Sequence, residues 1–342
     1  MIIRSKAPLR IGFAGGGSDV SPFSELFGGA ILNATLNKYA YATIIPRRDK
    51  TIILNSVDKN IRLKLESTEH IDPSGDLDLI KGIYNRIVRD FAAKPLSFEL
   101  ITHVDAPPGS GLGSSSTLVT AILGAFREWL NLALGEYDLA HLAYVIERED
   151  MGMSGGKQDQ YAATFGGVNF MEFYNGGKVI VNPLRIKHEI LDELSYNLIL
   201  YNTETSRLSS QIIAAQQENV KKNKAESVEA MHKIKEQAIL MKELLLKGEL
   251  NRMGEILNFG WQQKQKMAEG IVNQELLDIY NAAIKAGSSG GKISGAGGGG
   301  FMLFYCPKNT RHKVINALQP FRGKVESFEF TKNGLKTWKI NA

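Results

Sequence analysis

The apolar residues of this chain repeat at two spacings, and each spacing predicts one kind of element. From Leu96 to Val104, apolar and polar residues alternate, which is typical of a half-buried strand. From Leu118 to Leu130, apolar residues recur three and four positions apart, as on one buried helix face. The same helical spacing runs through 221–247. The chain is therefore expected to mix strands with long amphipathic helices.

The order of the remaining elements predicts an α+β fold. Residues up to about 180 combine strands with two or three helices and end in a hairpin around Asn175. The next third is mainly helical, apart from a strand-like run that starts at Leu194. Asn273 begins another helix, and strands are expected at 301–305 and 325–330.

Length and composition suggest two domains. A chain of 342 residues with 43% hydrophobic content can bury two modest cores. We expect an N-terminal domain over 1–185 and a C-terminal domain over 186–342. No apolar stretch is long enough for a signal-peptide core or a membrane span, so a cytoplasmic protein without a membrane partner is expected. The single Cys306 excludes an intramolecular disulfide and a cysteine-cluster metal site.

The charge pattern points to a small-molecule partner. The formal net charge is +5, and the lysines that contribute most visibly lie within 221–247. Glutamates are interleaved with them, which favours a solvated helix face over a nucleic-acid patch. We therefore expect no nucleic-acid partner, while a homodimer is left open.

Residues 107–116 form a glycine-rich loop between the strand at 96–104 and the helix that follows. Its glycines allow successive N–H groups to converge on phosphate oxygens, and its serines start a helix, where negative charge is favoured. A nucleotide polyphosphate is the natural guest, and a tight turn with a serine helix cap is the alternative. The residues expected to hold the phosphates are Pro108, Gly109, Ser110, Gly111, Leu112, Gly113, Ser114, Ser115 and Ser116.

Two further glycine clusters flank this loop along the chain. One runs over 6–19 and reads KAPLRIGFAGGGSD, and the other runs over 292–301 and reads KISGAGGGGF. The three ordered motifs resemble those of the galacto-, homoserine, mevalonate and phosphomevalonate (GHMP) kinase superfamily, over nearly the whole chain. The resemblance implies two α+β lobes with the ligands in the cleft between them, ATP as donor and Mg²⁺ as metal. The third cluster is expected to brace the central loop by close backbone packing.

The resemblance also implies which residues act in phosphoryl transfer. Asp159 matches the aspartate of the superfamily's Gly-x-x-Asp element and would be the general base. Arg10 occupies the superfamily's Arg/Lys position, where the cation would lie beside Asp159 and face the moving phosphoryl group. A helix cap is the alternative role for Asp159, and a surface salt bridge is that for Arg10.

A metal site is expected beside the loop. Glu147 matches the superfamily's magnesium glutamate, and Ser114 would supply a second oxygen ligand. Glu149 is the competing assignment, because the turn after Gly152 is one residue longer than the superfamily's pattern.

The acceptor side departs from galactokinase and mevalonate kinase. Those enzymes carry Glu-His where this chain has Gly16 and Gly17, a change that is expected to open room near the acceptor. Asp19 matches the superfamily's substrate-hydroxyl aspartate, with local hydrogen bonding as the alternative. The expected substrate contacts are Gly16, Gly17, Ser18, Asp19 and Lys157.

Within the superfamily, the runs AGGGSDVSPF, GGKQDQY and GGKISGAGGGGF resemble the heptose 7-phosphate kinases, and fucokinases share much of this pattern. The resemblance implies phosphorylation of the anomeric hydroxyl of D-glycero-D-manno-heptose 7-phosphate to the 1,7-bisphosphate, for nucleotide-heptose and surface polysaccharide synthesis. An L-fucose kinase or related free-sugar kinase and a catalytically silent sugar-and-ATP sensor are the alternatives. Candidate cations for the 7-phosphate are Arg4, Lys6, Lys38, Arg47, Arg48 and Lys157.

Overall fold

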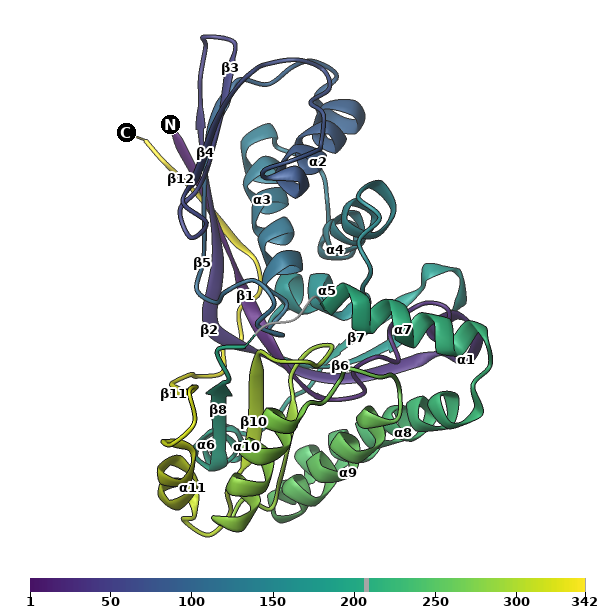
Figure 1. Cartoon of the computed structure of the whole chain (residues 1–342). Helices are drawn as coiled ribbons and strands as arrows, with labels where there is room; N and C mark the ends of the chain where they lie inside the picture. Colours follow the sequence, from purple (N-terminus) through teal and green to yellow (C-terminus); the bar gives the residue numbers. More distant parts are fainter. Residues whose placement is uncertain (206–208, 342) are drawn as a thin grey trace.

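The computed structural model describes residues 1–205 and 209–341, and this part contains two β-sheets with helices packed around them (Figure 1). The larger sheet has eight strands in the order β12-β1-β2-β5-β3-β4, with β6 paired to β2 and β7 paired to β6. All its pairings are antiparallel except that of β3 with β5. Its strands are β1 (Ile2–Ala14), β2 (Gly29–Pro46), β3 (Thr51–Ser56), β4 (Ile61–Glu66), β5 (Phe98–Val104), β6 (Val168–Phe173), β7 (Val179–Pro183) and β12 (Lys336–Ile340).

Helices from the first half of the chain cover one face of this sheet. The central one, α3, packs against β1 and β2, with α2, α4 and α5 beside it (Figure 1). These helices are α2 (Asp78–Ile87), α3 (Ser114–Leu130), α4 (Glu136–Val145) and α5 (Gln158–Phe165). The short α1 (Phe23–Phe27) instead packs with the C-terminal helices, because Phe23 shares a buried cluster with Met231 and Ile234. Two short π-helical turns, η1 (Val88–Ala92) and η2 (Ile146–Asp150), extend α2 and α4, and the 3₁₀ turn η3 (Asn175–Gly177) joins β6 to β7.

The smaller sheet is antiparallel and has four strands in the order β11-β8-β10-β9. Helix α9 packs against β9, while α8 packs against α9 and against β2 of the larger sheet. The strands are β8 (Leu198–Asn202), β9 (Gly290–Ile293), β10 (Phe301–Tyr305) and β11 (Lys324–Glu326). The helices are α6 (His188–Asn197), α7 (Ser209–Lys221), α8 (Ala225–Lys247), η4 (Leu250–Arg252), α9 (Met253–Gln265), α10 (Gln274–Lys285) and α11 (Arg311–Leu318).

The α+β prediction is confirmed, and so are the strand and helix on either side of the central loop, which are β5 and α3. The hairpin around Asn175 is confirmed by the β6–β7 pairing. The strand prediction from Leu194 is wrong at its start, because α6 continues to Asn197 and β8 begins only at Leu198. The last predicted strand is shorter than expected, and β12 beyond it was not predicted.

The largest buried apolar cluster contains side chains from both sheets, among them Ile11, Phe98 and Leu303, together with Met241 of α8. A smaller cluster around Trp261 and Phe304 lies within the C-terminal half. Since β12 also pairs with β1, the end of the chain belongs to the N-terminal sheet. The division at 185/186 stays a prediction, and the packing ties the two halves firmly together.

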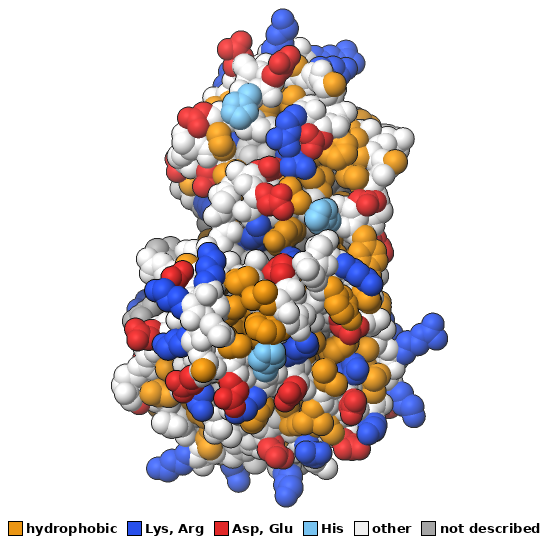
Figure 2. Space-filling model, turned by 90° about the vertical axis from the view of Figure 1, so that its right-hand side faces the viewer, with side chains coloured by type: hydrophobic (Ala, Val, Ile, Leu, Met, Phe, Trp, Pro, Cys, Tyr) orange, Lys and Arg blue, Asp and Glu red, His pale blue; other side chains and the backbone are white. Residues whose placement is uncertain are grey.

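The surface over the C-terminal helices is mixed in charge. Figure 2 shows Lys and Arg interspersed with Asp and Glu on the side where α7 and α8 lie. On α8, for example, Lys233 pairs with Glu229 at 2.6 Å. Among the described residues, no helix combines the length and the apolar character that a membrane crossing requires.

Candidate active site

The third glycine cluster packs directly against the central loop. A Cβ on Gly111 would lie 2.4 Å from the Ser294 carbonyl oxygen, and a Cβ on Gly295 would lie 2.6 Å from Gly111 Cα, so neither glycine can be replaced without moving the backbone. The Ser294 hydroxyl donates to the Gly111 carbonyl at 2.9 Å, and the Phe301 N–H donates to the Ser110 carbonyl at 2.9 Å. The predicted bracing role of this cluster is therefore confirmed.

The first motif reaches the same loop through Arg10, which is only 3% exposed. Its Nη1 donates to the Gly111 carbonyl at 2.6 Å, and its Nε donates to Asp159 Oδ1 at 2.7 Å. Its Nη2 lies 2.5 Å from the same oxygen. A Cβ on Gly113 would lie 3.1 Å from Asp159 Cγ, so the loop also passes close to this carboxylate. The structure thus joins Arg10, the loop and Asp159 in one partly buried cluster.

The carboxylate that caps α5 is Asp19, not Asp159. Asp19 Oδ2 accepts the N–H groups of Lys157 and Gln158 at 2.9 and 3.0 Å. Burial raises the pKa of Asp19, the hydrogen bond from the Gln158 N–H opposes this shift, and the nearby charge of Asp159 adds to it. Gly156 is required beside it, because a Cβ there would lie 1.9 Å from Asp19 Oδ2. Asp19 therefore has a local structural role in addition to facing the cavity.

Glu147 lies on η2 and is fully buried against the loop. Its Oε1 accepts from the Ser115 hydroxyl at 3.0 Å, and its Oε2 accepts from the Gln160 amide at 2.5 Å. The competing Glu149 is exposed. The hydroxyl that meets Glu147 thus belongs to Ser115, the neighbour of the expected Ser114.

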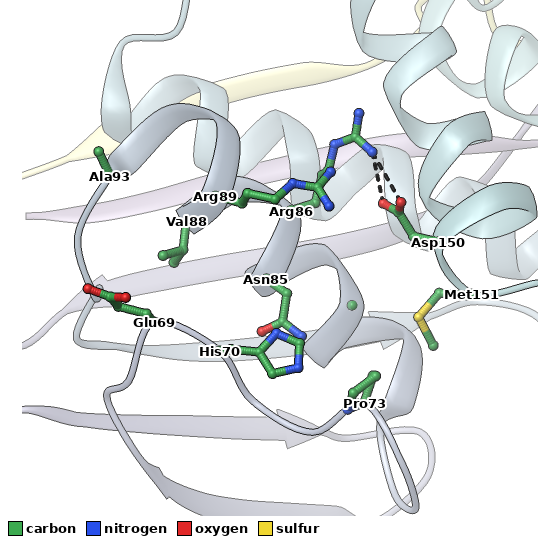
Figure 3. A pocket seen from close by; sticks show the side chains of 11 residues that line it. Glu69, His70, Pro73, Asn85, Arg86, Val88, Arg89, Ala93, Asp150 and Met151 are labelled. Carbon is green, nitrogen blue, oxygen red and sulfur yellow. Dashed lines mark hydrogen bonds and ion pairs between the residues drawn. The ribbon is translucent and has the colours of Figure 1, made fainter.

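Asp150, the next acidic residue, faces a different hollow of about 580 Å³ (Figure 3). Its carboxylate pairs there with Arg86 Nη1 at 3.1 Å, and Arg86 Nε also lies 2.5 Å from Asp90. Arg89 pairs with the same Asp90 at 2.7 Å. Neighbouring aspartates therefore neutralise both arginines of this hollow. Of the acidic residues within 147–150, only Glu147 has its carboxylate against the glycine-rich loop.

A cavity of about 670 Å³ lies where the three motifs meet. Most of the expected site residues line it, namely Arg10, Gly16, Gly17, Asp19, Pro108, Gly109, Gly111, Gly113, Ser114, Ser115, Ser116, Glu147 and Asp159. The side chains of Ser110 and Leu112, in the same loop, are buried and do not line the cavity. The Ser18 hydroxyl donates to the Gly15 carbonyl at 2.8 Å and so holds the turn.

Lys157 is placed away from the cavity, although it was expected to contact substrate. Its ammonium donates to Glu25 Oε1 at 2.7 Å and lies 5.6 Å from the Tyr144 ring centroid. None of the other candidate cations for a second phosphate lines the cavity either; Lys38, for instance, pairs with Glu326 at 2.6 Å. A second phosphate would need another cation.

Two buried lysines that sequence reasoning missed do line this cavity, Lys264 and Lys292. Lys292 donates to the Gly12 carbonyl at 2.7 Å. Burial lowers its pKa well below the ordinary value, and the charges of Lys264 and Arg10 lower it further. Burial lowers the pKa of Lys264 to about 8, with Asp19 opposing the shift and Arg10 adding to it. Lys292 stands in the third motif and could have been singled out there, whereas Lys264 follows no motif.

Known proteins resemble this chain over nearly its full length. The model for the GHMP kinases N terminal domain matches residues 78–167, and that for the GHMP kinases C terminal domain matches 241–324. A D-glycero-alpha-D-manno-heptose 7-phosphate kinase of Campylobacter jejuni is 50% identical over 99% of this chain and 99% of that protein. A bifunctional fucokinase/GDP-fucose pyrophosphorylase of Arabidopsis thaliana is 27% identical over 90% of this chain but only 30% of its own length.

Solved structures agree with these matches. A D-glycero-D-manno-heptose 1-phosphate kinase of Bacteroides thetaiotaomicron has 45% identity and a TM-score of 0.85, over 99% of this chain and 100% of that one. A putative sugar kinase of Campylobacter jejuni has 49% identity and a TM-score of 0.82, over 99% and 98%. With both domain models matched and half of its residues shared with a full-length relative, the chain belongs to the GHMP kinase family.

Proposed function

We propose that this chain is an ATP-dependent kinase that phosphorylates the anomeric hydroxyl of D-glycero-D-manno-heptose 7-phosphate, giving the 1,7-bisphosphate. The observation that carries the proposal is the partly buried Arg10–Asp159 pair, held against the glycine loop by two segments far apart in the sequence. Phosphoryl transfer is mainly positioning and charge stabilisation, and this cluster offers a carboxylate and a cation side by side. The use of ATP favours a cytoplasmic reaction.

Asp159 would receive the acceptor hydroxyl. Its side chain is 21% exposed towards the cavity, whereas that of Arg10 is 4% exposed, so the carboxylate is the more accessible partner of the pair. An anomeric hydroxyl is more acidic than an ordinary alcohol, so Asp159 would orient it as much as deprotonate it. Arg10 would face the transferred phosphoryl group while it keeps Asp159 in place.

The central loop would hold the nucleotide phosphates at the start of α3. Gly113 is the N-cap of this helix, and Ser114, Ser115 and Ser116 form its first turn, where unpaired N–H groups favour anions. A fully buried carboxylate beside a serine hydroxyl is the donor set that Mg²⁺ accepts, with phosphate and water completing the shell. Glu147 and Ser115 would hold that ion, which neutralises phosphate charge when bound.

The choice of acceptor rests on the relatives and on one feature of the cavity. The Campylobacter jejuni relative of 50% identity is named for a heptose 7-phosphate, and the Bacteroides thetaiotaomicron structure for a heptose 1-phosphate. Both names specify an acceptor that already carries a phosphate. The cavity suits such an acceptor, because the lysines Lys264 and Lys292 line it in addition to Arg10.

The test is an ADP-release assay with ATP, magnesium chloride and a panel of acceptors. The panel contains heptose 7-phosphate, heptose 1-phosphate, L-fucose, D-galactose and mevalonate. We expect the highest kcat/KM for heptose 7-phosphate. A preference for L-fucose would favour a free-sugar kinase, and a preference for heptose 1-phosphate would move the transfer to another hydroxyl. Tight binding of ATP and sugar without ADP release would favour a sensor.

A further inference from the structure

Four cationic side chains line the cavity within the described residues, and three of them are already engaged. Arg10 is bonded to Asp159, and Lys292 donates to a backbone carbonyl at 2.7 Å. Arg148 packs over Gly155, where a Cβ would lie 2.2 Å from its guanidinium carbon, and it donates to the carbonyls of its own turn. Lys264 is the fourth cation, and it differs from the other three.

Lys264 is buried, and no carboxylate of the described residues forms an ion pair with it, although the charge of Asp19 acts on it from nearby. Lys264 is 3% exposed, and its polar contact among the described residues is a long one, 3.4 Å from Nζ to the Gly16 carbonyl oxygen. A buried ammonium is strongly unfavourable unless an anion or several hydrogen bonds compensate it. Burial accordingly lowers the pKa of Lys264 to about 8. An incoming dianion would supply the direct ion pair that Asp19 does not make with Lys264.

A second unsatisfied group lies at the same end of the cavity. Gln216, on α7, is 2% exposed, and its Nε2 has no hydrogen-bond partner among the described residues. It lines the cavity together with Lys264 and Gly16. A buried amide N–H without a partner is rare in folded proteins, which points to a ligand oxygen at this position.

The glycine pair of the first motif shapes this end of the cavity. A Cβ on Gly17 would lie 2.4 Å from Met267 Cε and 3.5 Å from Gln216 Oε1, so that side of the turn is filled by Met267. A Cβ on Gly16 would meet nothing within 4 Å. The room that both glycines were expected to open is therefore open only at Gly16, whose carbonyl contacts Lys264.

We propose that Lys264 and Gln216 bind the phosphate that the acceptor sugar already carries. The inference rests on the proposed function and names the recognition site for its substrate class. A phosphate offers the dianion that Lys264 needs and an acceptor oxygen for the Gln216 amide, whereas a sugar hydroxyl would leave the ammonium uncompensated. Lys264 is thus a specificity-determining residue that distinguishes sugar phosphates from free sugars.

The test compares phosphorylated and neutral acceptors in matched variants. Lys264→Met keeps the length of the side chain and removes the charge, and Gln216→Glu places a like charge beside the phosphate. Lys266→Met is the control, since Lys266 is exposed two residues further along. We expect Lys264→Met to lower kcat/KM for heptose 7-phosphate or mannose 6-phosphate by about 10- to 100-fold relative to the neutral sugar, with the KM for ATP unchanged.

Several results would overturn the inference. An equal fall in kcat/KM for phosphorylated and neutral sugars would mean that Lys264 acts on the transferred phosphoryl group. Unchanged kcat/KM for both sugars would leave Lys264 no role in recognition. Folding is checked by thermal unfolding, where removal of an uncompensated buried charge should not lower Tm.

Calorimetric binding of heptose 7-phosphate, without ATP, separates this inference from the proposed function. If the wild-type protein binds the sugar phosphate and Lys264→Met binds it at least 10-fold more weakly, the phosphate site stands even when turnover is absent. If the wild-type protein releases ADP with sugar phosphates but Lys264→Met binds them equally well, the proposed function stands and the inference falls.

Discussion

Replacing Asp159 by Asn tests the catalytic cluster with little change in shape. Asn retains an oxygen that can accept from Arg10 Nε, which now lies 2.7 Å from Asp159 Oδ1. The substitution removes the charge and the base, and a positioned general base contributes about 10²–10⁴ in rate. At about 1.36 kcal/mol per decade, turnover should fall by an amount equivalent to roughly 3–5 kcal/mol of activation free energy.

The same change should have only a small effect on folding and on nucleotide binding. A charged hydrogen bond becomes a neutral one in a partly exposed pair, so the free energy of unfolding should fall by about 1 kcal/mol. The affinity for ATP should stay within a few-fold, because the loop that holds the phosphates keeps its backbone. Thermal unfolding, equilibrium ATP binding and ADP release measure the three quantities separately.

Asp150→Asn is the matched control. Asp150 also pairs with an arginine, and its side chain is 27% exposed compared with 21% for Asp159, but it faces the separate hollow in Figure 3. It should lose similar stability and keep near-normal turnover. Turnover of Asp159→Asn within ten-fold of wild type, or an equal loss in Asp150→Asn, would refute the assignment of Asp159.

Three further predictions concern other parts of the site. Glu147→Gln should raise the magnesium concentration required for half-maximal activity, and Glu149→Gln should not. A titration of activity with magnesium chloride measures this, and the reverse result would assign the role of metal ligand to Glu149. Gly111→Ala adds a methyl 2.4 Å from a carbonyl oxygen at φ +78°, so Tm and ATP affinity should both fall. Gly16→Ala should keep its Tm, because its Cβ would meet nothing within 4 Å. An unchanged Tm in Gly111→Ala as well as in Gly16→Ala would contradict the close packing of Gly111 against Ser294. The pKa of Lys264 is lowered to about 8, so its ammonium loses a proton as the pH rises through 8. The preference for phosphorylated over neutral sugar should therefore fall in that range. The same fall in Lys264→Met would show that another group causes it.

The sequence alone predicted the parts of the site that lie within the three glycine motifs. Arg10 stands in the first of those motifs, whereas Asp159 and Glu147 were matched through other elements of the superfamily, and the structure brings all three to one cavity. The bracing of the central loop could also be predicted, because glycines in a row permit backbones to approach within a distance that any Cβ would prevent.

Residues outside the motifs were harder to place, for physical reasons. Lys264 is the single lysine of α9 and stands in no motif, and its burial depends on packing against a turn 248 residues earlier. Lys157 stands next to the expected base, yet a glutamate 132 residues away pairs with its ammonium. Which serine contacts Glu147 depends on the phase of α3, since neighbouring serines on a helix point in different directions.

The most direct test of the central claim is phosphorus NMR of the product made from heptose 7-phosphate, ATP and magnesium. The account predicts a sugar that carries two phosphates, one unchanged at C7 and a new one whose phosphorus couples to the anomeric proton at C1. A new phosphate on any other carbon, or no new sugar phosphate although ATP and acceptor both bind, would contradict it.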